Sequence, residues 1–261
     1  MELNYFTKNY QNTETGNNNI FIEFTKLTDN LDYLKEHKDF IQANNLGFGD
    51  RAFAYMWFLL LKHLQKHNEA INVLEIGVFK GQVISLWSLI AQKENICVNV
   101  NGISPLEGKP RDKNKVVKIF KYLTSKKYRQ DIQAGNFYES ADYLLLINKL
   151  FSHFGLDFSK VNLVKGYSSD PAVLEKFSNT KLDLVYVDGD HSYQGSLSDI
   201  NHFSDKINQG GFLVIDDASC NIPGTVFWKG HQSVSDACEM IDSDKFKNIL
   251  NVGHNRVFQK V

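Results

Sequence analysis

The sequence predicts an α/β fold in which a doubly wound, mostly parallel sheet is covered by helices on both faces. From about residue 50 onward, short apolar runs alternate with longer amphipathic segments. Several of these runs are apolar throughout, which is typical of parallel strands buried on both faces. The last two runs are separated by only a Gly-His-Asn turn, which predicts an antiparallel hairpin at one edge of the sheet.

Seven strands alternate with helices in this prediction. The strands are expected over residues 71–77, 97–104, 161–166, 182–189, 210–217, 246–253 and 255–261. Helices are expected over residues 29–44, 51–67, 82–92, 113–128, 140–154, 169–177, 193–207 and 233–241. The segment over 51–67 is dense in apolar residues and long enough to be a buried helix.

Two parts of the chain depart from this regular alternation. Residues 1–45 show no clean period before the expected helix, so we predict an irregular N-terminal extension. Asp50 is the expected N-cap of the next helix, and residues 46–261 are expected to form one domain. Residues 105–160 form a helical insertion, because this connection is far longer than usual. Such an insertion would lie beside the carboxyl ends of the strands, where open α/β sheets bind ligands.

Composition excludes some classes of protein. The 261 residues carry 29 Lys and Arg against 30 Asp and Glu, which argues against bulk binding to nucleic acid or an anionic membrane. The sequence contains neither a signal peptide nor an apolar run long enough to span a membrane. The three cysteines are widely spaced, without a paired motif that would indicate a zinc site. We therefore expect a cytoplasmic protein, and association into a homo-oligomer stays open.

A local basic segment stands out against this neutral total. Residues 109–129 contain nine Lys or Arg residues and one acid, Asp112. One interpretation is a solvated helix face. The other is that the segment attracts an anionic or phosphorylated small-molecule substrate. RNA is disfavoured, since the segment lacks the interleaved glycine and aromatic residues of stacking platforms.

The motif VLEIGVFKG ends the first expected strand. Gly77 allows a sharp turn and Gly81 allows a ligand to approach the backbone, but the dinucleotide fingerprint Gly-x-Gly-x-x-Gly is absent. The motif resembles the first motif of class I S-adenosylmethionine-dependent methyltransferases, which have a Rossmann-like fold. The resemblance implies that this loop contacts the methionine and ribose of the cofactor and that Glu75 holds its ammonium group. A turn without a ligand is the alternative.

Two further stretches are weaker matches to this family. The family usually has an acidic residue at the end of the second strand for the ribose hydroxyls, whereas this chain has Ser104 there, with Glu107 in the following loop. After the third strand, the resemblance places Tyr167 and Ser168 near the adenine or methionine moiety. We take these four residues as cofactor-binding candidates.

Acidic residues follow the fourth and fifth strands. In the family's strand order these strands are neighbours, so Asp188 would face Asp216 and Asp217. Like charges about 4 Å apart repel by about 4 kcal/mol at an effective dielectric near 20, so the group requires protonation or a cation. The arrangement resembles metal-dependent small-molecule O-methyltransferases. The resemblance implies a divalent cation on these three carboxylates, and Mg²⁺ suits oxygen ligands.

His191 follows Asp188 closely, in the stretch DGDH. Sugar O-methyltransferases with a similar stretch use the histidine as a general base, which implies that role for His191 beside the catalytic Asp188. A structural histidine and an Asp190 that only caps a helix are the alternatives. In the loop after Asp217, Trp228 is a candidate for stacking on substrate and His231 is expected near the active site.

The favoured function is O-methylation of a small molecule such as a sugar, nucleotide sugar or surface-glycan precursor. Two alternatives remain open at this point. One is a metal-independent methyltransferase acting on nitrogen or on a phosphate derivative. The other is a methyltransferase-like binding scaffold without activity, for which Ser104 in the ribose position is the best argument.

Overall fold

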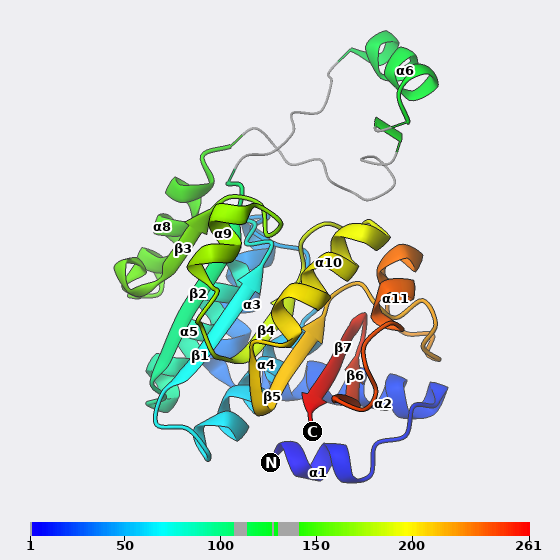
Figure 1. The fold of residues 1–261 in the computed structure, drawn as a ribbon. Coiled ribbons are helices and arrows are strands. Elements are labelled where there is room, and N and C mark those ends of the chain that lie inside the picture. Colours follow the sequence, from blue (N-terminus) through cyan, green and yellow to red (C-terminus); the bar gives the residue numbers. More distant parts are fainter. Residues whose placement is uncertain (1, 107–113, 127, 130–140) are drawn as a thin grey trace.

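The computed structural model describes all residues except 1, 107–113, 127 and 130–140. Its central sheet has seven strands in the order β3-β2-β1-β4-β5-β7-β6 (Figure 1). The strands are β1 (Ile71–Ile76), β2 (Val98–Ser104), β3 (Asn162–Lys165), β4 (Leu182–Val187), β5 (Ile207–Ile215), β6 (Phe246–Val252) and β7 (Asn255–Lys260). The first five are parallel, and β7 runs antiparallel between β5 and β6. The predicted fold class, including the edge hairpin, is confirmed.

Helices cover both faces of the sheet. The helices of the described residues are α1 (Leu3–Lys8), α2 (Glu14–Asp29), α3 (Asp32–Ala43), α4 (Ala52–Gln65), α5 (Gln82–Glu94), α6 (Lys115–Thr124), α8 (Tyr143–His153), α9 (Pro171–Lys176), α10 (Tyr193–Ser204) and α11 (Gln232–Cys238), of which α6 alone lies away from the sheet. Val73 and Leu184 belong to the apolar core that includes α4 and α5, whereas Leu74 and Val185 belong to the core that includes α10 and α11. Every residue of β4 is buried, as expected for a strand covered on both sides.

The N-terminal extension is more helical than predicted. Residues expected to be irregular form α1 and α2. The Thr13 side chain caps α2 by accepting a hydrogen bond from the Gly16 N–H at 3.1 Å, and Phe24 of this helix is fully buried. The prediction failed because Asn and Thr dilute the apolar period of α2, while its burial depends on α4 and β6, which lie far along the chain.

Two predicted helix boundaries were also wrong. The residue preceding α4 in the cap position is Arg51, without a side-chain cap, and the Asp50 carboxylate lies 3.5 Å from His254 instead. Helix α10 ends at Ser204 rather than at 207, because Ile207 already pairs with Leu182 of β4.

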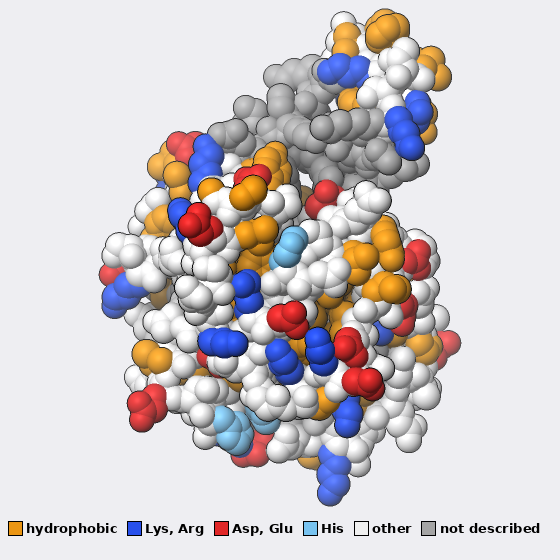
Figure 2. All heavy atoms as spheres, viewed as in Figure 1, with side chains coloured by type: hydrophobic (Ala, Val, Ile, Leu, Met, Phe, Trp, Pro, Cys, Tyr) orange, Lys and Arg blue, Asp and Glu red, His pale blue; other side chains and the backbone are white. Residues whose placement is uncertain are grey.

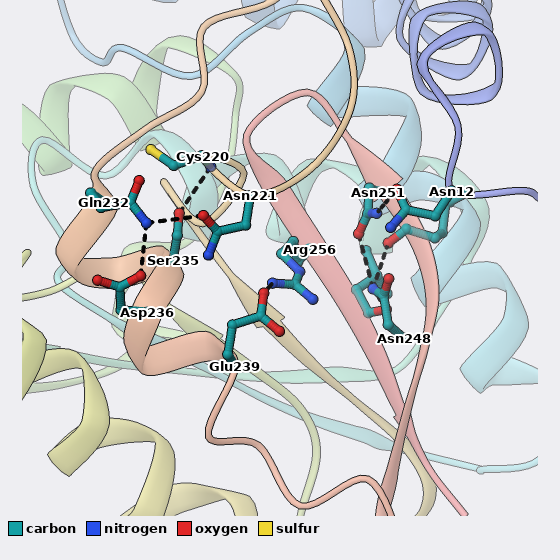
Figure 3. A network of polar contacts seen from close by, with 12 residues as sticks. Asn12, Cys220, Asn221, Gln232, Ser235, Asp236, Glu239, Asn248, Asn251 and Arg256 are labelled. Atoms are coloured by element: carbon teal, nitrogen blue, oxygen red, sulfur yellow. Dashed lines mark hydrogen bonds and ion pairs between the residues drawn. The ribbon is translucent and has the colours of Figure 1, made fainter.

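Polar contacts tie the extension to the edge hairpin (Figure 3). Asn251 of β6 donates a hydrogen bond to the Tyr10 hydroxyl at 2.6 Å, and that hydroxyl donates to Asn17 of α2 at 2.6 Å. Asn251 and Asn17 are both fully buried, so their polar groups require these partners. The extension thus packs on the edge hairpin of the sheet. The acidic residues lie in the same sheet, at the carboxyl ends of β4 and β5.

The insertion contains the two predicted helices, α6 and α8. Ile147 and Phe151 of α8 are buried, whereas α6 has no buried residue and projects away from the sheet (Figure 1). Lys and Arg side chains lie beside apolar ones on this projecting part (Figure 2). Within the described ranges, no helix combines the length and apolar character needed to cross a bilayer.

The buried side chain of His37 is expected to make the free energy of unfolding depend on pH. Burial, followed by the charge of Lys38, lowers the pKa of His37 to about 3, and its Nε2 atom lies 2.9 Å from the Ser85 hydroxyl. Because the folded-state pKa is depressed, His37 contributes stability above the unfolded pKa, and this contribution is lost as pH falls below it. We expect the contribution to fall by about 2 kcal/mol between about pH 7.5 and about pH 5.

Urea unfolding of the wild type and of His37→Gln at these two pH values measures this effect. The wild type should lose about 2 kcal/mol more unfolding free energy than the variant, whose glutamine does not titrate. Equal losses in the two proteins would show that His37 is solvated or charged in the folded state.

Candidate functional site

The turn between β1 and α5 requires glycine at two positions. Gly77 has φ +102°, and a Cβ atom there would lie 1.8 Å from the Asp188 carbonyl oxygen. Gly81 has φ +87° and is the N-cap residue of α5, facing Ile147 of α8. Side chains are disfavoured at such φ values. The turn after β1 therefore lies directly against the first residue after β4.

Glu75 is a buried carboxyl group beside this turn. Burial raises its pKa to about 8, with a further contribution from the Asp216 charge, while a hydrogen bond from the Ile84 backbone opposes the shift. Its Oε2 atom is buried and accepts no hydrogen bond from the described part of the chain. Such an atom is costly unless it is paired, so the position fits the ammonium group of S-adenosylmethionine.

Asp188 and Asp216 follow directly after β4 and β5. These strands pair in parallel, and the Asp216 N–H donates to the Val187 carbonyl at 3.0 Å. Burial raises the pKa of Asp188 well above its ordinary value, with further contributions from the charges of Asp216 and Glu75 and from a hydrogen bond with Asp216. Burial, followed by the charges of Asp216 and Asp188, raises the pKa of Asp217 to about 9. The three predicted acids thus share one electrostatic environment.

His191 lies within this acidic group. Its Nε2 atom is 3.6 Å from Asp188 Oδ1 and 3.5 Å from Asp217 Oδ2. Its ring stacks on that of His231, with ring centroids 4.9 Å apart. Asp190 lies beside the group but accepts a hydrogen bond from the Ser192 N–H at 2.9 Å, and the residue that caps α10 is Ser192.

The loop after β5 returns to the same place, as expected for His231. The His231 N–H donates to the Asp217 carbonyl at 2.9 Å, and His231 Nε2 is 3.7 Å from Asp217 Oδ2. Trp228 is half exposed and meets the rings of His231 and His254 edge-on. The Cys220 N–H of this loop donates a hydrogen bond to the Ser235 hydroxyl of α11 at 2.9 Å (Figure 3).

The weaker cofactor candidates lie elsewhere on the strand ends. Ser104 is buried at the end of β2, where its hydroxyl accepts a hydrogen bond from the Leu106 N–H at 3.1 Å. Tyr167 is exposed after β3, and the Ser168 hydroxyl bonds to Asp199, a buried acid of α10 outside the strand-end group. Glu107 lies outside the described residues.

Sequence reasoning missed His254 and Asp50. His254 occupies the turn between β6 and β7, is 5% exposed, and lies 3.4 Å from Asp216 Oδ1 through its Nε2 atom. Only the position of β7 beside β5 brings it to the acids. A histidine in a hairpin turn carries no signal of this contact in the sequence.

Two groups of side chains have the spacing of metal ligands in the described ranges. They are Asp216, Asp217 and His254, and His191, Asp217 and His231, with ligand atoms within 4.8 Å of one another. Carboxylate oxygens and imidazole nitrogens are the ligands of divalent cations, so the donor set fits such an ion. The predicted ligand Asp188 is in neither group, although it lies beside both through Asp216 and His191.

The sequence matches a known protein family. Residues 74–218 match a family described as "Methyltransferase domain". An uncharacterized protein, R132 of Acanthamoeba polyphaga mimivirus, is 27% identical over 183 residues, which are 68% of this chain and 64% of that protein. The aligned region thus spans less than two thirds of this relative.

Solved structures show the same fold. The O-methyltransferase NovP superposes with a TM-score of 0.56 at 16% identity, covering 80% of this chain and 79% of that one. An O-methyltransferase from Bacillus cereus in complex with SAH superposes with a TM-score of 0.51 at 15% identity, covering 88% and 91%.

Proposed function

The chain belongs to the methyltransferase domain family, and we propose that it transfers a methyl group from S-adenosylmethionine to a hydroxyl group of a small molecule with the help of a divalent cation. One observation carries the proposal: the glycine turn after β1 lies against the first acid after β4, since a Cβ at Gly77 would lie 1.8 Å from the Asp188 carbonyl oxygen. A cofactor held by the turn would have its methyl group next to the acids and His191.

The proposed cofactor site uses the residues around this turn. S-adenosylmethionine supplies a methyl group on a positively charged sulfonium. Glu75 pairs with the ammonium group, which its buried Oε2 atom supports. The absence of side chains at Gly77 and Gly81 lets the cofactor approach the backbone. Candidates for the ribose and adenine contacts remain Ser104, Glu107, Tyr167 and Ser168.

The proposed acceptor site uses His191 as general base. When bound by the carboxylates of Asp188, Asp216 and Asp217, a divalent cation such as Mg²⁺ stabilises the ionised form of the acceptor hydroxyl. His191 takes the hydroxyl proton, because imidazole is the side chain that most often serves as a general base. The resulting imidazolium is stabilised by Asp188 and Asp217, at 3.6 Å and 3.5 Å. The acceptor oxygen then attacks the methyl carbon, so that the new C–O bond forms as the C–S bond breaks and S-adenosylhomocysteine leaves.

The acceptor class rests on composition more than on geometry. A sugar, nucleotide sugar or surface-glycan precursor is our preferred acceptor, and the lysines that α6 exposes favour the anionic members of this class. Its anionic character, the cytoplasmic location and the boundary between residues 45 and 46 remain predictions.

Incubation with a panel of sugars and nucleotide sugars and with methyl-labelled S-adenosylmethionine tests the proposal. We expect label in a sugar hydroxyl, detected by mass spectrometry, and a loss of transfer with EDTA that added cation restores. Transfer that survives EDTA would favour the metal-independent alternative. No saturable binding of S-adenosylhomocysteine by calorimetry would favour the scaffold without activity.

A further inference from the structure

The turn between β6 and β7 directs one histidine at the acidic strand ends. His254 is 5% exposed, and its Nε2 atom is 3.4 Å from Asp216 Oδ1 and 3.7 Å from Asp217 Oδ1. Asp216 Oδ1 is buried and has no hydrogen-bond partner among the described residues. One nitrogen from the hairpin turn and two oxygens from the end of β5 therefore face a common point.

The distances from His254 Nε2 to the two carboxylates are longer than hydrogen bonds and close to those between ligands of one metal ion. A hydrogen bond between N–H and O has a length of about 2.7–3.2 Å. Two atoms bound to the same ion at about 2.1 Å lie roughly 3.0–3.5 Å apart. The distance from His254 to Asp216, 3.4 Å, fits the second range, and the distance to Asp217, 3.7 Å, is slightly longer.

The far side of the His254 ring has the environment of a metal ligand. Its Nδ1 atom faces Asp50 Oδ2 at 3.5 Å, an ion-pair distance rather than a hydrogen bond, and metal-binding histidines usually direct their second nitrogen at a carboxylate or carbonyl group. The rings of Phe53 and Trp228 meet His254 edge-on, with centroids 4.6 Å and 5.2 Å away. These contacts fix the ring plane and keep Nε2 toward the acids.

The backbone also holds Asp217 in an unusual conformation. Its φ is +54°, which is uncommon for a residue other than glycine and is found mainly where surrounding structure enforces it. The neighbouring Ala218 N–H donates to the His254 carbonyl at 2.9 Å, and the His231 N–H donates to the Asp217 carbonyl. The hairpin turn and the acid pair are thus bound to each other directly.

We propose that Asp216, Asp217 and His254 bind the catalytic cation as two oxygens and one nitrogen, with Asp50 orienting His254, and that this site prefers Mn²⁺ to Mg²⁺. The inference rests on the proposed function, because it specifies the metal of the same site. An imidazole ligand favours first-row transition metals over Mg²⁺, and Mn²⁺ is the one of these that, like Mg²⁺, also suits carboxylate ligands. His254 thus replaces Asp188 in the ligand set of the proposed function, and Asp188 and His191 remain available to the acceptor hydroxyl.

Pulsed EPR of Mn²⁺ bound to the full-length protein tests the ligand set. We expect ¹⁴N coupling from a bound imidazole and at least tenfold tighter binding of Mn²⁺ than of Mg²⁺ in competition titrations. His254→Ala should lose the coupling and bind Mn²⁺ at least tenfold more weakly. Asp50→Asn should keep the coupling and bind Mn²⁺ about 10–100-fold more weakly, which covers the case that His254→Ala does not fold.

His202→Ala is the matched control, because His202 is an exposed histidine of α10; it should bind Mn²⁺ like the wild type. Mn²⁺ binding without ¹⁴N coupling, or coupling and affinity that persist in a folded His254→Ala variant, would overturn the proposal. So would the absence of Mn²⁺ binding at millimolar concentration. Calorimetry with S-adenosylhomocysteine on the same samples tests the proposed function separately.

Discussion

His191→Ala is expected to slow methyl transfer by about 10²–10⁴-fold, the usual contribution of a general base, while S-adenosylhomocysteine binds as tightly as to the wild type. The reason is the position of the imidazole, which lies 3.6 Å from Asp188 and 3.5 Å from Asp217. Single-turnover rates with labelled cofactor measure the chemical step, and calorimetry measures cofactor affinity. Added imidazole should restore part of the rate, because the deletion leaves space for a small base.

His202→Ala supplies the control, since both variants remove one histidine ring and His202 lies on the exposed side of α10. Its rate should equal that of the wild type. An unchanged rate in His191→Ala would remove this residue from the mechanism. Equal losses of cofactor binding and rate would instead assign it a structural role.

Gly77→Ala is expected to destabilise the fold by about 2–5 kcal/mol and to weaken cofactor binding at least tenfold. The left-handed backbone costs about 1–2 kcal/mol for a residue with a Cβ, and overpacking adds about 1–3 kcal/mol. The added methyl would lie 1.8 Å from the Asp188 carbonyl oxygen, a backbone atom that cannot rotate away. Urea unfolding and calorimetry with S-adenosylhomocysteine measure the two effects.

Gly210→Ala separates the cost of a positive φ from the cost of the contact with the Asp188 carbonyl oxygen. Gly210 also has a positive φ, +77°, but an added Cβ there meets no atom within 4 Å. It should lose only about 1–2 kcal/mol of unfolding free energy and bind the cofactor normally. If the two variants behave alike, the turn after β1 does not lie tightly against Asp188.

The sequence predicted the sheet because its signals are local. The apolar runs of β1, β4 and β5 mark buried parallel strands, and the acids at their ends follow from the strand order. The role of Asp188, Asp216 and Asp217 remains a proposal, although the structure brings all three to neighbouring strand ends. Glu75 and Gly77 could be singled out as candidates for the same reason, since a strand, a turn and a helix are adjacent in sequence, and their role in cofactor binding remains a proposal.

Features that depend on distant packing were not predictable. Helix α2 is rich in Asn and Thr, and only its burial against α4 and β6 reveals Phe24 as a core residue. His254 is an ordinary turn residue until β7 pairs with β5. Asp50 resembles a helix cap in sequence, but its carboxylate faces that histidine instead. In each case, a partner far along the chain decides the environment.

A crystal structure of the protein with S-adenosylhomocysteine tests the central claim most directly. The account predicts that the amino-acid end of the ligand contacts Glu75 and Gly77, with its sulfur atom facing the space between Asp188 and His191. Ligand density at another place on the protein, with its sulfur away from both acidic strand ends, would contradict it.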